Sequence, residues 1–279
     1  MSEASPQPSA TSVTDPSVVV RNVSKIYPGP SGLQGKQADT VTAVKDASLV
    51  VSKGESIGFL GQNGSGKSTL LRLIAGAESP TKGAIRVSAT PTLLAVGAAL
   101  IPTLSGRRNI ELGCLAKGMT PEQTKTELQD IIEFVDIGDA IDRPLNTYSS
   151  GMAARLRFGV GTAGKPDLLI VDEALSTGDA AFSGKAERRM KAMLKRSGTL
   201  FLVSHAAKEV ERNCGRAAWL HKGEIISDGP SEIVCQQYRE WVQLRASDKF
   251  DGAERFLEEV QQGFIRPTIL FDSEIIVGG

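Results

Sequence analysis

Residues 61–69 read Gly-Gln-Asn-Gly-Ser-Gly-Lys-Ser-Thr, and the interpretation of the whole chain starts from this stretch. The apolar residues 56–60 before it are typical of a buried strand, and residues 70–75 after it predict the first turns of a helix. Three glycines allow the connecting backbone to curl so that successive N–H groups point at one anion. The N-terminus of the helix adds unpaired N–H groups and a positive dipole end. The sequence therefore predicts a loop that binds the phosphates of a nucleotide.

Three side chains of this loop have the chemistry that a nucleotide phosphate needs. Lys67 is expected to reach the β- and γ-phosphates, where a charge pair at ~4 Å contributes ~4 kcal/mol before desolvation. Ser68 supplies a hydroxyl for Mg²⁺, and Thr69 is close enough to touch a phosphate oxygen. The expected phosphate-binding residues are Gly61, Asn63, Gly64, Ser65, Gly66, Lys67, Ser68 and Thr69.

Composition limits the possible classes of protein. The 32 basic and 32 acidic residues balance, and the basic ones are scattered with few aromatics between them, which argues against a nucleic-acid binder. Cys114, Cys214 and Cys235 are far apart and lack metal-ligand spacing, which favours a reduced, intracellular compartment. The longest apolar run, residues 93–102, is far shorter than the ~20 residues that span a bilayer. Any membrane role is therefore expected to come through a partner.

Unbroken apolar runs alternate with helix-forming segments in the second half of the chain. Residues 168–171 and 200–203 predict buried strands, and their alternation with helices indicates a parallel sheet covered on both faces. Residues 103–163 are helical in character and predict a subdomain at the side of this α/β core, with Ser105 and Thr120 as helix caps. Further strand patterns occur at residues 18–23, 41–51, 217–220 and 224–227, the last two as a hairpin.

An acidic pair, Asp172 and Glu173, follows the strand at residues 168–171 directly. Ligands of open α/β sheets bind at the carboxyl ends of strands, where both carboxylates can turn toward one site. We expect Asp172 to hold Mg²⁺ through water and Glu173 to polarise the attacking water as general base. A solvated acidic pair at a strand end is the alternative, and the presence of Lys67 and Ser68 favours the functional interpretation.

His205 follows the other buried strand in the same way. A neutral imidazole there could donate a hydrogen bond to the γ-phosphate and orient the attacking water. A structural histidine at a strand end is the alternative. The second histidine, His221, lies in the expected hairpin and receives no role.

Residues 148–152 read Tyr-Ser-Ser-Gly-Met and precede another helix-forming run. Ser149 is placed to cap this helix, and the free N–H groups beside Ser150 and Gly151 would make a second anion site. An ordinary helix cap explains these residues equally well on local grounds.

Taken in order, these motifs resemble the ATPase subunit of an ABC transporter. A phosphate loop, a serine-glycine helix cap, an Asp-Glu strand end and a Ser-His strand end follow one another within residues 18–245. The resemblance implies an α/β fold: a P-loop NTPase (RecA-like) core with an antiparallel β subdomain and a helical subdomain. It also implies hydrolysis of ATP with Mg²⁺ by a homodimer. Each ATP would lie between the phosphate loop of one chain and Ser149, Ser150 and Gly151 of the other.

The resemblance adds two site residues. Tyr27 matches the family's aromatic residue that stacks on adenine, a contact of a kind that contributes ~1–3 kcal/mol in nucleic-acid binding sites. A core tyrosine is the alternative. Asp179 matches the aspartate that closes the motif after the Asp-Glu pair, and it is expected at the nucleotide.

Several departures from the usual family pattern indicate which branch of the family this chain resembles. Residues 148–152 stand where most members read Leu-Ser-Gly-Gly-Gln, and residues 176–179 read Ser-Thr-Gly-Asp in place of Ser-Ala-Leu-Asp. The glutamine that most members carry between the phosphate loop and the helical subdomain is missing, and residues 96–98 read Val-Gly-Ala near its place. With residues 103–110, these variants resemble the branch that exports lipid-linked polysaccharides: O-antigen, capsule, teichoic-acid or galactan precursors. The residue that replaces the glutamine stays open.

The branch implies partners, a location and a domain organisation. Two ATPase subunits would work with two copies of an integral membrane permease that carries polyprenyl-linked polysaccharide, at the cytoplasmic face of the membrane. We expect a disordered tail at residues 1–17, the ATPase domain at residues 18–246 and an extension at residues 247–279. Some members end in a carbohydrate-binding domain, and this extension is too short for one, so the chain is not expected to select glycan ends.

Three other functions stay open from the sequence. The same fold could serve an importer or a small-molecule exporter. A soluble ABC ATPase could act on ribosomes or DNA, although such proteins usually carry two ATPase domains or long coiled-coil insertions. The third possible function is a nucleotide-gated binding module that hydrolyses almost no ATP, which the missing glutamine leaves open.

Overall fold

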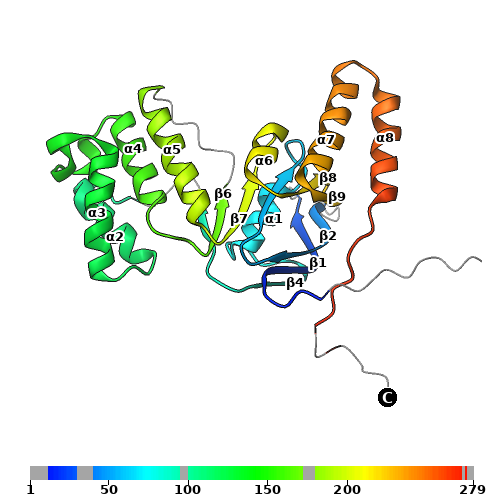
Figure 1. Ribbon diagram of the computed structural model, residues 1–279, viewed down its shortest axis with the longest axis horizontal. Helices are drawn as coiled ribbons and strands as arrows, with labels where there is room; N and C mark the ends of the chain where they lie inside the picture. Colours follow the sequence, from blue (N-terminus) through cyan, green and yellow to red (C-terminus); the bar gives the residue numbers. More distant parts are fainter. Residues whose placement is uncertain (1–11, 30–39, 95–99, 172–179, 272–273, 275–279) are drawn as a thin grey trace, which may run out of the picture.

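The computed structural model describes residues 12–29, 40–94, 100–171, 180–271 and 274, whose arrangement is shown in Figure 1. A central sheet carries a second, smaller sheet on one face and helices on the other. A separate group of helices lies at one end of the molecule, and a pair of long helices lies at the other (Figure 1).

The central sheet is mostly parallel, as the sequence predicts. Neighbouring strands are parallel from β5 to β8, and β9 returns antiparallel to β8. The hairpin turn between β8 and β9 holds Lys222 and Gly223, both with positive φ, which confirms the predicted hairpin. In spatial order the strands are β5 (Thr92–Leu94), β6 (Leu168–Val171), β7 (Thr199–Val203), β3 (Ser56–Leu60), β8 (Arg216–His221) and β9 (Glu224–Pro230).

Side chains of the buried strands alternate between two cores. In β6, Leu168 and Ile170 pack toward α1 (Lys67–Ile74) and the smaller sheet. Leu169 and Val171 face the other way, toward the helices α6 (Ala207–Asn213) and α7 (Ser231–Ala246). All four side chains are buried, which explains why this strand is apolar without a break.

The smaller sheet is antiparallel and consists of β2 (Thr40–Ser52), β1 (Pro16–Pro28) and β4 (Lys82–Val87). β1 begins two residues before the predicted boundary at residue 18, because Pro16 pairs with Ser52 and Ser17 is buried. The predicted tail otherwise falls largely on residues 1–11, which lie outside the described residues.

The helices at one end form a subdomain with its own core. Its members are α2 (Gly106–Ala116), α3 (Pro121–Val135), the 3-10 turns η1 (Gly138–Asp142) and η2 (Leu145–Thr147), and α4 (Ser150–Gly161). Ser105 caps α2, and Thr120 forms a capping box with Gln123 at the start of α3, so both predicted caps are confirmed. α5 (Ala180–Arg196) joins this subdomain to the central sheet, because its Phe182 packs against Phe134 and Phe158 and its Met193 is buried in the core beside the sheet.

The C-terminal part of the chain returns to the core. α8 (Phe250–Gly263) runs beside α7, and its Ala253 is buried in the core beneath that helix (Figure 1). Residues 264–271 then follow the smaller sheet, where Phe271 lies 3.9 Å from the Arg86 guanidinium. An ion pair joins Arg266 to Asp46. The sequence analysis predicts no structure for this segment.

Lys117 closes the C-terminal end of α4. Its ammonium group donates hydrogen bonds to the carbonyl oxygens of Val160, Gly161 and Ala163 at 2.8, 2.6 and 3.2 Å. Carbonyl groups at a helix end lack their usual intrahelical donors, and here that of Val160 also accepts a hydrogen bond from the N–H of Ala163 at 3.3 Å. Burial lowers the pKa of Lys117 to about 8.

We expect Lys117→Met to lower the free energy of unfolding by about 1–3 kcal/mol, because methionine occupies a similar volume but cannot donate hydrogen bonds to these carbonyl groups. Urea unfolding measures the loss. Lys125→Met, on an exposed position of α3, is the control and should change stability by less than about 0.5 kcal/mol. Equal stability of the two variants would contradict a capping role for Lys117.

Candidate functional site

The glycine-rich loop joins β3 to α1, as the sequence predicts. Gly64 and Gly66 have positive φ angles of 79° and 102°. A Cβ atom on Gly66 would lie 2.3 Å from the carbonyl oxygen of Ala43, so a larger residue would displace the loop. The loop leads directly into the N-terminus of α1, where the first N–H groups of a helix have no intrahelical partner.

The Lys67 side chain lies inside this loop and is only 6% exposed. Its ammonium group donates hydrogen bonds to the carbonyl oxygens of Gly61 and Gln62 at 2.6 and 2.9 Å. Thr69 is buried and Ser68 is exposed at the start of the helix. A buried positive charge beside a helix N-terminus fits a phosphate anion, so these residues suit a nucleoside triphosphate.

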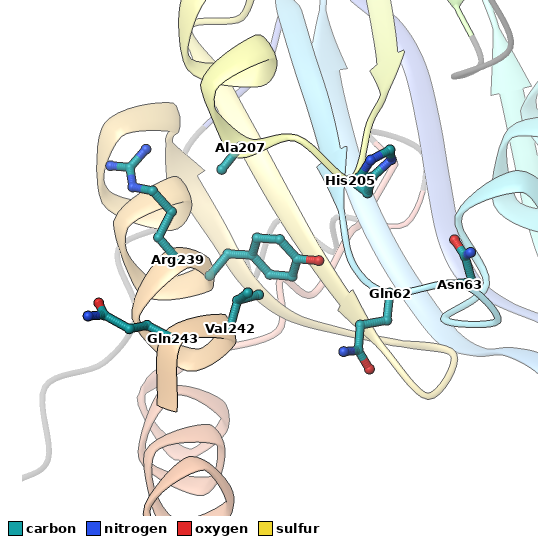
Figure 2. A pocket seen from close by; sticks show the side chains of 8 residues that line it. Gln62, Asn63, His205, Ala207, Arg239, Val242 and Gln243 are labelled. Atoms are coloured by element: carbon teal, nitrogen blue, oxygen red, sulfur yellow. The ribbon is translucent and has the colours of Figure 1, made fainter. Parts of the chain in front are cut away.

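A cavity of about 720 Å³ borders the loop on the side of α7 (Figure 2). The loop contributes Gln62 and Asn63, and His205 reaches the cavity from the end of β7. Because β3 and β7 are neighbouring parallel strands, their carboxyl ends lie together. The tertiary structure thus brings His205 beside the phosphate loop. The other lining residues are Ala207, Tyr238, Arg239, Val242 and Gln243.

Ser204 holds the turn that carries His205. Its hydroxyl oxygen accepts a hydrogen bond from the backbone N–H of Ala206 at 3.0 Å, and its O–H donates to Glu209 at 2.7 Å. The other histidine, His221, packs edge-on against Trp241. Burial lowers the pKa of His221.

The predicted residues Asp172, Glu173 and Asp179 lie outside the described residues. β6 ends at Val171, which pairs with Leu202 close to the end of β7. Within the part of the chain that the structure describes, His, Cys, Asp and Glu side chains form no group of three that could hold a metal ion. The roles of the acidic residues and the Mg²⁺ site therefore stay predictions.

The predicted second anion site begins α4. Ser149 caps this helix by accepting a hydrogen bond from the N–H of Met152 at 3.2 Å, and Ser150 and Gly151 form its first turn. Tyr148 fixes the entry to the helix, because its hydroxyl donates to the carbonyl oxygen of Ala140 at 2.7 Å. Figure 1 shows α4 in the helical subdomain, far from α1, so one chain alone does not bring this site to its own phosphate loop.

Tyr27 lies near the end of β1, and its hydroxyl donates a hydrogen bond to Glu78 Oε2 at 2.6 Å. Glu78 also forms ion pairs with Arg72 and Lys25, at 2.8 and 3.2 Å. The sequence analysis missed Glu78 and Arg72. No local pattern connects Glu78 with Tyr27, because 51 positions separate the two residues.

Arg245 is a further contact to the phosphate loop that the sequence analysis missed. From the end of α7 it donates a hydrogen bond to Gln62 Oε1 at 3.2 Å, and its guanidinium lies over the Trp241 ring. A basic residue in the last turn of a helix looks like an ordinary helix-dipole partner, so the sequence alone would not single it out.

Solved structures share this fold. An ATP-binding subunit of an ABC transporter superposes with a TM-score of 0.63 over 79% of this chain and 92% of its own, at 21% identity. A post-hydrolysis dimer of the ATP-binding cassette MJ0796 with ADP and phosphate superposes with a TM-score of 0.60. The match covers 77% of this chain and 98% of that one, also at 21% identity. These likenesses confirm the predicted α/β P-loop NTPase fold.

The family model described as ABC transporter matches residues 44–176. A teichoic acids export ATP-binding protein of Enterococcus faecalis is 41% identical over 72% of this chain and 45% of its own length. An O-antigen export system ATP-binding protein of Myxococcus xanthus is 41% identical over 76% of this chain and 48% of its own length. The chain thus spans about half the length of these relatives. Among the described residues, every helix is too short or too polar to cross a membrane.

Proposed function

We propose that this chain is the ATP-hydrolysing subunit of a polysaccharide exporter of the ABC transporter family, whose model matches residues 44–176. Lys67 inside the glycine loop carries the nucleotide part of the proposal, because its charge lies where nucleotide phosphates would bind. The cargo part rests on the relatives named for teichoic-acid and O-antigen export and on the departures of this sequence from the common family motifs.

The phosphate loop would hold the triphosphate. Lys67 would exchange its bonds to loop carbonyls for bonds to the β- and γ-phosphates, while the N–H groups at the start of α1 face the same anion. Ser68 and Asp172 would hold Mg²⁺, which neutralises charge on the phosphate oxygens when bound.

Hydrolysis needs a base and an orienting group. Glu173 would accept a proton from the attacking water as it approaches the γ-phosphate. His205, which shares a cavity with Asn63, would donate a hydrogen bond to the γ-phosphate and keep the water in line. Without these groups hydrolysis would be slow, because nothing would position the attacking water.

A second copy of the chain would complete the site. The Ser149 cap and the first turn of α4 lie too far from the phosphate loop of the same chain, so Ser149, Ser150 and Gly151 would bind the γ-phosphate of the other copy. Asp179 would lie at the same interface. ATP binding would close this homodimer and hydrolysis would reopen it, which moves a partner that crosses the membrane.

The proposed partner is an integral membrane permease, present in two copies, that carries polyprenyl-linked polysaccharide. The ATPase subunits would lie on the cytoplasmic face of the membrane and attach through the permease. Export of a polymer needs repeated cycles, and ATP-driven closure and opening of a dimer supplies them.

Depletion of the protein in its own cell tests the proposed cargo. We expect long polyprenyl-linked polysaccharide to accumulate in the lipid extract, because synthesis at the inner face continues while export stops. Mass spectrometry of the extract would also identify the polymer. Depletion of an unrelated ABC ATPase of the same cell is the control.

An unchanged lipid-linked pool after complete depletion would contradict polysaccharide export and leave only the ATPase assignment. Co-purification with ribosomes or DNA, and not with membranes, would instead favour a soluble ABC ATPase.

A further inference from the structure

The hydroxyl group of Tyr27 is engaged within the protein. It donates to Glu78 Oε2 at 2.6 Å, a short distance that is typical of a strong bond to a charged acceptor. This bond lowers the pKa of the Glu78 carboxyl, with further lowering by Lys25 and Arg72. Since the hydroxyl is committed to Glu78, the face of the aromatic ring is what Tyr27 can offer to a ligand.

Glu78 receives three donors from two different elements, β1 and α1. Besides Tyr27 of β1, Arg72 of α1 pairs with Oε1 at 2.8 Å and Lys25 of β1 pairs with Oε2 at 3.2 Å. The Lys25 ammonium also donates to the carbonyl oxygen of Ser79 at 2.8 Å and lies 5.1 Å from the centre of the Tyr27 ring. The ring is therefore held at its hydroxyl by Glu78 and along one face by Lys25.

The position of Glu78 is set by the end of α1. The N–H of Ala77 bonds to the carbonyl oxygen of Arg72 at 2.9 Å, and Gly76 adopts a positive φ of 70°. This is a glycine-terminated helix end of a common kind, so the chain after α1 leaves in a defined direction. Glu78 thus moves with α1.

α1 is also the helix that begins at the phosphate loop. Arg72, which binds Glu78, also donates to Thr69 Oγ1 at 3.4 Å in the first turn of the helix. A hydrogen bond with Tyr27 raises the pKa of Arg72. A continuous path of polar contacts therefore joins the Tyr27 ring, Glu78, Arg72 and Thr69.

We propose that Glu78 is a positioning residue that fixes the Tyr27 ring relative to the phosphate loop, so that the ring stacks on the base of a bound nucleotide. This inference rests on the proposed nucleotide function of the same site. Stacking depends on the distance and tilt of the ring plane, and a ring tied to α1 keeps both constant relative to the phosphates. Without Glu78 the ring would rotate, and the base would lose its contact while the phosphates keep theirs.

Two variants test the proposal with two ligands. Glu78→Ala removes the acceptor, and Tyr27→Phe removes the hydroxyl but keeps the ring. We expect each to weaken binding of a fluorescent ATP analogue by about 3- to 10-fold, the range that loss of one hydrogen bond produces. Inorganic tripolyphosphate, which has no base, should displace the analogue with the same affinity constant in wild type and variants.

The double variant adds a second criterion. If Glu78 acts through Tyr27, then Glu78→Ala with Tyr27→Phe should bind ATP no more weakly than Glu78→Ala alone. Glu111→Ala is the matched control, because Glu111 also pairs with an arginine, Arg108, at 2.7 Å but lies in the helical subdomain. It should bind both ligands as wild type does.

Equal weakening of ATP and tripolyphosphate in Glu78→Ala would overturn the proposal, because Glu78 would then act on the phosphate loop itself. Unchanged ATP affinity in Tyr27→Phe would overturn it as well. This second variant keeps every ion pair of Glu78 and so remains usable if Glu78→Ala does not fold. A wild-type protein that binds neither ligand would contradict the proposed function instead.

Discussion

Lys67→Ala is expected to weaken ATP binding by at least about 100-fold. The ammonium group lies inside the glycine loop, 6% exposed, where its attraction to two phosphates is poorly screened by solvent. Alanine removes this charge together with the hydrogen bonds that Lys67 donates to the loop carbonyls of Gly61 and Gln62. Equilibrium titration with a fluorescent ATP analogue measures the loss.

Lys53→Ala is the control for this change, since Lys53 is an exposed lysine in the turn before β3 and should leave affinity unchanged. Thermal unfolding of Lys67→Ala establishes that the fold survives. If folded Lys67→Ala protein binds ATP as wild type does, the glycine loop is excluded as the nucleotide-binding site.

Glu173→Gln is expected to reduce the rate of ATP hydrolysis by about 10²- to 10⁴-fold, because the amide cannot accept a proton from the attacking water. ATP binding should persist, since the phosphate loop is unchanged. With ATP always intact, the proposed dimer should stay closed and elute as a dimer in size-exclusion chromatography. Phosphate release and elution volume are the two readouts.

Glu254→Gln, an exposed substitution on α8, is the control and should hydrolyse ATP at the wild-type rate. Full hydrolysis by Glu173→Gln would exclude this glutamate as the base. If the wild-type protein itself released no phosphate, with ATP bound, the chain would be a nucleotide-gated binding module.

Local patterns predicted several features of the fold correctly because each depends on nearby residues. The glycine loop needs a strand before it and a helix after it, and β3 and α1 stand there. Helix caps such as Ser105, Thr120 and Ser149 bond to N–H groups within three residues of themselves. The hairpin at Lys222 and Gly223 likewise depends on local backbone conformation.

Contacts between distant segments of the chain have no comparable local pattern in the sequence. Residues 264–271 return to the smaller sheet, where Phe271 lies against Arg86 and Arg21, although the sequence around Phe271 resembles an irregular tail. The same holds for Arg245, which reaches Gln62 from the end of α7. Each of these contacts depends on where whole helices and strands pack.

The sequence by itself determined the chemistry of the proposed site. It identified the phosphate loop around Lys67, the strand end at His205 and the cap at Ser149, because short-range spacing and strand ends carry that information. Only the tertiary structure decided which of these residues meet. Pairing of β3 with β7 brings His205 to Asn63, and the separation of α4 from α1 keeps Ser149 away from the phosphate loop of its own chain. The Tyr27–Glu78 bond joins residues 51 positions apart, and such a contact exists only after the two sheets and α1 have packed.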